Sequence, residues 1–136
     1  RNTLLDNIWL VRVLPLNKLA KERISERIAE AIKAIKEDDF EFARGRGREL
    51  ITFSEIFKDD TEWAEELSCS GLLWSASVGT ASDYLEGSVP AAQKEKLKEI
   101  LTTYLQKAKE SLDKEDWLDF HKNFRSMWYN TVSKTP

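Results

Sequence analysis

The chain has 136 residues, 41% of them hydrophobic and 33% charged, which is the composition of one ordinary globular domain rather than of a disordered chain. The formal net charge of −3 argues against a dedicated nucleic-acid binder, whose surface is usually basic. The single Cys and the single His exclude an intramolecular disulfide and the usual zinc sites built from several such ligands.

Helical signals begin near the start of the sequence. We expect a short helix over residues 3–13, which Pro15 stops. Residues 17–37 carry apolar side chains at spacings of three and four opposite a face of mixed charge, which predicts an amphipathic helix. Asp38 then serves as the expected cap of a helix over residues 38–57, with Glu41 three residues later. Gly47 lies on the inner stripe of that helix, where its missing side chain should permit a close helix contact.

Residues 60–87 place large side chains at helical spacing among many Ser, Thr, Ala and Gly residues. Because so little bulk suits a helix that others approach closely, we expect this to be the central helix of a bundle. Gly71→Leu or Gly79→Leu should then destabilise the fold by overpacking. We also expect Cys69 to be a buried, inert thiol, and Gly87 to end the helix in the left-handed conformation.

Two more helices are predicted, over residues 90–112, with Pro90 in the first turn, and over residues 115–128, followed by a polar tail. No stretch alternates long enough for a strand, and the short connections make neighbouring helices antiparallel. The sequence therefore predicts one all-α domain over residues 1–136, an up-and-down antiparallel helical bundle of five to six helices. It would consist of a four-helix-bundle core with a short N-terminal helix and an extra C-terminal helix.

An internal similarity relates residues 21–48 to residues 98–125 at a constant offset of 77. Asp39 matches Asp116, and Arg48 matches Arg125, with apolar positions agreeing between them. Each copy reads as a long helix, a tight acidic turn and the start of a second helix. The similarity fits a duplicated hairpin, and it also fits the pattern that any two amphipathic hairpins share.

No motif indicates catalysis. His121 lies one turn before Arg125, but nothing local places a nucleophile beside a base. No Glu stands three residues before His121, as a di-iron bundle would need, and no Gly-rich phosphate loop is present. We therefore expect His121 to be a surface or boundary residue, and the chain to be no enzyme and to hold no cofactor or metal. An enzyme that uses His121 and Arg125 is kept as an alternative.

Two basic runs are the candidate docking sites for an acidic protein partner. They comprise Arg44, Arg46, Arg48, Lys94, Lys96 and Lys98. The alternative is that both runs are solvated helix faces whose charges pair with neighbouring carboxylates. The five Trp residues admit two readings as well, because they can form the core or line a pocket for a hydrophobic ligand.

The pattern of Ile35, Phe40, Ala43 and Arg48 resembles the first hairpin of the PsbQ-like extrinsic subunits of photosystem II, which are four-helix bundles. A further set resembles that family's third and fourth helices: Leu73, Trp74, Ala81, Tyr84 and the Lys-rich helix from Lys94 to Leu112. The chain departs from the family where Phe40 replaces a Trp and where the helix over residues 115–128 is added. The resemblance implies a lumenal thylakoid protein that docks on the photosystem, helps retain the ions of water oxidation and has no active site.

Together these features predict a non-catalytic bundle that docks on and stabilises a larger protein complex, with photosystem II as its most specific form. A carrier for a hydrophobic ligand and a generic interaction adaptor are the alternatives. We expect no nucleic-acid partner and no transmembrane segment, so any membrane association should be peripheral. The start at Arg1 rather than Met suggests a processed chain or a piece of a longer protein.

Overall fold

The computed structural model describes residues 16–57 and 64–135, so the helix expected over residues 3–13 lies outside the described ranges. Within them the chain forms five helices and no strand, which confirms the predicted all-α helical bundle. In chain order they are α2 (Leu16–Lys36), α3 (Phe40–Phe57), α4 (Ala64–Leu85), α5 (Ala91–Asp113) and α6 (Trp117–Ser133). The last helix continues past residue 128, where a polar tail was expected.

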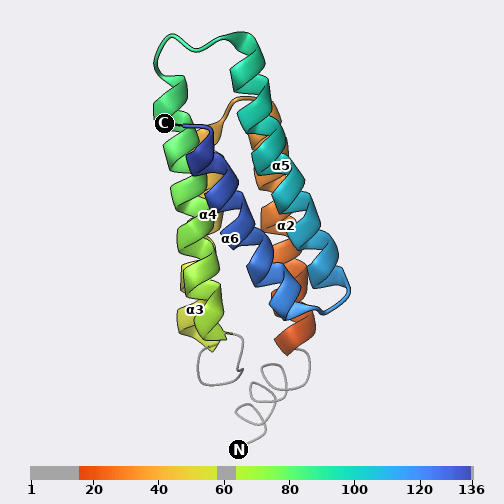
Figure 1. The fold of residues 1–136 in the computed structure, drawn as a ribbon. Coiled ribbons are helices and arrows are strands. Elements are labelled where there is room, and N and C mark those ends of the chain that lie inside the picture. The colour runs from red at the N-terminus through yellow and green to blue at the C-terminus, as the bar shows by residue number, and fades with distance from the viewer. Residues whose placement is uncertain (1–15, 58–63, 136) are drawn as a thin grey trace, which may run out of the picture.

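The helices run up and down the long axis of the molecule (Figure 1). α4 packs between α3 and α6, while α2 packs between α3 and α5, and α5 also contacts α6 and α4. The apolar stripes of all five helices meet inside this arrangement. The largest fully buried side chains there are Trp74, Phe120, Phe124, Ile24, Ile28, Ile35, Leu50, Leu67, Leu97, Leu101, Leu105 and Leu112.

The α2–α3 turn and the α5–α6 turn have the same backbone structure at the offset of 77. Asp38 (φ 64°) and Glu115 (φ 58°) are left-handed, and the next residue donates its N–H to the carbonyl five residues earlier. The N···O distance of this hydrogen bond is 2.8 Å for Asp39 and 2.9 Å for Asp116. A bond of this kind is the mark of a Schellman motif. The Asp39 and Asp116 side chains then cap the following helices, because each carboxylate accepts from the backbone N–H three residues later, at 3.2 and 3.0 Å. The helix cap is therefore Asp39, and the prediction of Asp38 was wrong because Asp38 ends the preceding helix.

The two hairpins also reach across to each other in an equivalent way. Lys98 on α5 binds Asp38 in the first turn at 2.8 Å, and Lys21 on α2 lies 3.5 Å from Glu115 in the second. Both Lys residues and both acidic residues are separated by the offset of 77. The helical hairpins α2–α3 and α5–α6 are thus approximately equivalent halves, and α4 lies between their second helices.

Trp74 of α4 connects the two halves. Its indole Nε1 donates to the Ala43 carbonyl of α3 at 3.0 Å, and its ring stacks on Phe124 of α6 at 5.7 Å and 9°. A Cβ on Gly47 would lie 2.6 Å from the Trp74 ring, and a Cβ on Gly71 would lie 2.8 Å from the Gly47 carbonyl oxygen. The prediction that Gly47 permits a close helix contact is confirmed.

Three expectations for α4 need correction. Cys69 is an exposed thiol rather than the buried one expected, and it lies on a side of α4 where Leu72 and Ala76 are also exposed. Ser, Cys and Ala differ too little in hydropathy to show which side of such a helix faces solvent. A Cβ on Gly79 would meet the flexible Arg44 side chain at 3.3 Å, so overpacking is expected at Gly71 but not there. Gly87 does not have a positive φ.

The Gly47 contact predicts a specific loss of stability. Gly47→Ala should lower the free energy of unfolding by about 1–3 kcal/mol, because the new methyl group overlaps a buried indole ring. Gly45→Ala is the matched control, since nothing lies within 4 Å of its added Cβ and Ala favours the helix by up to about 1 kcal/mol. Urea unfolding measures both variants. Equal stability of the two would contradict the assigned α3–α4 contact.

Candidate docking surface

The six basic residues predicted for docking do not form one free patch. Lys94 and Lys98 bind the carboxylate of Asp38 at 3.1 and 2.8 Å. Hydrogen bonds from these two Lys residues lower the pKa of the Asp38 carboxyl, and the Asp38 partner raises the pKa of Lys98. These two Lys residues hold α5 against the α2–α3 turn, whereas Lys96 is exposed and has no ion-pair partner in residues 16–57 or 64–135.

Arg46 is occupied by contacts inside the first hairpin. Its guanidinium lies 2.9 Å from Glu49 and 3.7 Å from Glu30, and it sits 4.7 Å above the centre of the Phe42 ring. Arg27 of α2 also binds Glu49, at 3.1 Å, so this cluster joins α2 to α3. For Arg46, Lys94 and Lys98, the alternative of pairing with neighbouring carboxylates is the one that the geometry supports.

Arg44 and Arg48 differ from the others because they border an open hollow between α3 and α4. Arg44 binds Glu41 at 3.0 Å on the solvent side, and its backbone carbonyl accepts from the Ser75 hydroxyl at 3.3 Å. Arg48 is exposed, and no carboxylate pairs with it in the part of the chain that the structure describes. These two side chains are the basic residues best placed to meet a partner.

The hollow is a groove of about 530 Å³ along the seam of the two helices. Its main lining residues are Arg44, Arg48, Leu72, Ala76, Gly79 and Asp83. Small side chains of α4 form the floor, and Leu72, whose side chain is 58% exposed, lies toward one end. We call this hollow the α3–α4 groove. The sequence signal for it is the row of small residues in α4, which by itself predicts only close approach by other helices.

His121 is buried, contrary to the expectation of a surface or boundary residue. It is 3% exposed, and a 2.5 Å hydrogen bond joins its Nδ1 to the hydroxyl of Ser70 on α4. Its Nε2 lies 3.9 Å from the Glu66 carboxylate and has no hydrogen-bond partner among the described residues. The amphipathic pattern of α6 did not reveal this, because Ser70 is 51 residues away in the sequence.

Ser70, His121 and Glu66 are residue types of a hydrolase triad. However, Ser70 is only 2% exposed, so a substrate carbonyl has no path to its hydroxyl in this conformation. The hydroxyl also bonds Nδ1, the nitrogen that faces the carboxylate in a hydrolase triad. We therefore interpret the group as a polar contact across the α4–α6 seam. Elsewhere in the described ranges, no three His, Cys, Asp or Glu side chains gather as metal ligands would.

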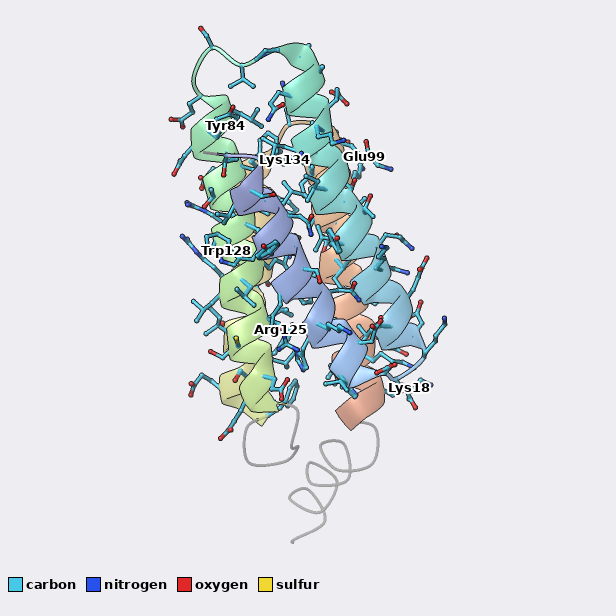
Figure 2. All side chains as sticks on the ribbon, viewed as in Figure 1. Lys18, Tyr84, Glu99, Arg125, Trp128 and Lys134 are labelled. Carbon is cyan, nitrogen blue, oxygen red and sulfur yellow. The ribbon has the colours of Figure 1, made fainter. Side chains whose placement is uncertain are left out.

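The Trp74 indole is part of a filled core. It is fully buried, and no Trp lines the α3–α4 groove or any of three other well-formed hollows on the described residues. Trp128 lies on α6, where Figure 2 labels it, and is only partly buried. The geometry at Trp74 fits the core interpretation of the aromatic residues better than that of a ligand pocket.

Comparison with known proteins adds no assignment: none of the family models, curated proteins or solved structures that were compared with the chain matches it. None of the helices in the described ranges has the length and apolar character that a membrane crossing requires.

His121 predicts how stability depends on pH. Burial lowers the pKa of His121 from its usual 6.5 to about 4; Glu66 opposes this shift, and Arg125 adds to it. Between these two pH values the unfolded chain takes up a proton that the folded chain excludes, so stability falls as the pH falls. The loss should reach about 3 kcal/mol by pH 4.

Urea unfolding of the wild-type chain and of His121→Gln, between pH 7 and pH 4, measures this effect. The variant should be less stable at pH 7, and its free energy of unfolding should change much less than that of the wild type between pH 7 and pH 4. A parallel decline in both proteins would contradict the burial of a neutral His121.

Proposed function

We propose that the chain is a non-catalytic docking subunit that binds a larger protein complex and stabilises it through the α3–α4 groove. The observation that carries this proposal is Arg48, an exposed guanidinium at the edge of a groove with no carboxylate partner in the described residues. Unpaired charges at the rim of a surface steer association with an oppositely charged partner. Arg44 adds a second guanidinium one helical turn away.

The most specific form of the proposal is an extrinsic lumenal subunit of photosystem II, as the resemblance to the PsbQ-like family implies. The residues of the first hairpin that carry the resemblance lie partly in the core and partly at the surface. Ile35 and Ala43 are buried core residues, Phe40 packs against that core, and Arg48 is exposed. A core pattern with an exposed Arg supports docking in general, and the choice of photosystem rests on the resemblance alone.

Charge reversal tests the docking proposal. Arg44→Glu with Arg48→Glu should weaken retention of the chain in its native complex by at least about tenfold at low salt, because each reversed charge replaces attraction by repulsion. The difference from the wild type should shrink at about 0.5 M salt, where exposed charges are screened within a few ångströms. Co-fractionation on size-exclusion chromatography measures retention.

Lys96→Glu is the matched control, since Lys96 is exposed and unpaired within the described ranges but lies on α5, away from the groove. It should leave retention unchanged. Arg48→Glu alone provides a second test, because Arg48 makes no ion pair with any described residue whose loss could disturb the fold. A chain that stays monomeric in its source cells would contradict the docking function, and full retention of both Arg variants would remove the α3–α4 groove from it.

A further inference from the structure

The α3–α4 groove is an elongated surface depression that follows the two helices, and its form suits a helix better than a small molecule. Its floor on α4 runs from Leu72 to Asp83, a distance of about 16 Å along the helix axis. Ala76 is exposed on this floor, and a Cβ on Gly79 would meet only Arg44. Three turns of a helix of another protein match this length, and the small side chains allow its backbone to approach.

The charges along the groove are arranged in a definite order. Arg44 and Arg48 stand four residues apart on α3, so their guanidinium groups rise from one face at a spacing of one turn. The Arg44 guanidinium forms an ion pair with the exposed Glu41, and its Nε–H is buried with no acceptor in the described ranges. Asp83 lies toward the end nearest the α2–α3 turn, and the exposed Leu72 lies toward the other end.

On this basis, and resting on the proposed docking function, we infer that the α3–α4 groove binds an acidic α-helix of the partner protein. The helix carries two carboxylates four residues apart, which bind Arg44 and Arg48. The Arg guanidinium donates paired, charge-assisted hydrogen bonds to a carboxylate, which give such a contact both strength and orientation. An apolar side chain of the same helix covers Leu72.

A protein helix suits the groove better than a nucleic acid. The chain has a net charge of −3, and Asp83 lies inside the groove, where it would repel a run of phosphates. A helix can instead place a neutral or basic residue opposite Asp83 and its carboxylates opposite the two Arg residues. The order of charges therefore sets the direction in which the partner helix lies.

The second hairpin does not offer the same site. At the offset of 77, Arg48 corresponds to the exposed Arg125, which Figure 2 labels on α6. Arg44 corresponds to His121, which is buried against Ser70 and cannot present a charge to a partner. In the described residues, this Arg pair one turn apart beside a groove, with Arg48 exposed and Arg44 partly buried, is thus specific to the first hairpin.

Two synthetic Ala-rich peptides of about 18 residues, long enough to form helix in water, provide the probes. One carries two Glu residues four positions apart, and the other has Gln at the same positions. Amide NMR spectra of the ¹⁵N-labelled full chain follow the titration at low salt. The Glu peptide should bind at least about tenfold more tightly than the Gln peptide and shift the signals of Arg48, Ala76 and Gly79.

Three variants of the chain sharpen the result. Ala76→Trp should abolish binding, because the exposed floor is filled without any change in charge. Glu41→Gln should strengthen binding of the Glu peptide, because it frees Arg44, and a purely structural role of Arg44 would not produce that gain. Lys96→Glu should leave binding unchanged.

The inference is overturned if the two peptides bind equally, or if the shifted signals lie on α5 or α6. It is also overturned if a single-stranded oligonucleotide or a second copy of the chain occupies the α3–α4 groove in place of the Glu peptide. These outcomes leave the docking function standing when the chain still co-fractionates with its complex. Loss of co-fractionation with intact peptide binding would instead reject the docking function and keep the acidic-helix site.

Discussion

The contact of the Trp74 indole with both hairpins is the interaction on which the arrangement of the bundle depends. The ring donates to α3 through the Ala43 carbonyl and stacks on Phe124 of α6. Gly47 and Phe124 are equivalent positions at the offset of 77, so one hairpin supplies space for the ring and the other supplies a stacking partner. Because Gly47 lets α3 approach α4 closely, Arg44 comes to lie against Gly79 at the edge of the α3–α4 groove.

The approximate equivalence of the hairpins explains both what the halves share and where they differ. Left-handed residues at Asp38 and Glu115 end the first helix of each hairpin, and each turn is bound by a Lys of the other hairpin. The halves diverge where they face α4: Arg44 is partly exposed, whereas its counterpart His121 is buried. Among the described residues, a function that needs Arg44 and Arg48 one turn apart beside a groove therefore belongs to the first half.

The helices were predictable from the sequence because apolar spacing, acidic caps and prolines are local signals. The offset of 77 also anticipated that two similar hairpins flank α4. Burial of His121 and pairing of Lys98 were not predictable, since their partners Ser70 and Asp38 are distant in sequence. The exposed side of α4 was missed because its small residues show almost no hydropathy contrast. Of the six basic residues proposed for docking, geometry therefore favours Arg44 and Arg48.

The most direct test of docking through the α3–α4 groove is hydroxyl-radical footprinting of the chain, free and within its native complex. Leu72 in the α3–α4 groove is 58% exposed, while Leu118 and Tyr129 on α6 are 73% and 76% exposed and serve as internal references. The account predicts that oxidation of Leu72 is suppressed in the complex, whereas Leu118 and Tyr129 are oxidised as in the free chain. Protection of the two α6 residues with undiminished oxidation of Leu72 would contradict it.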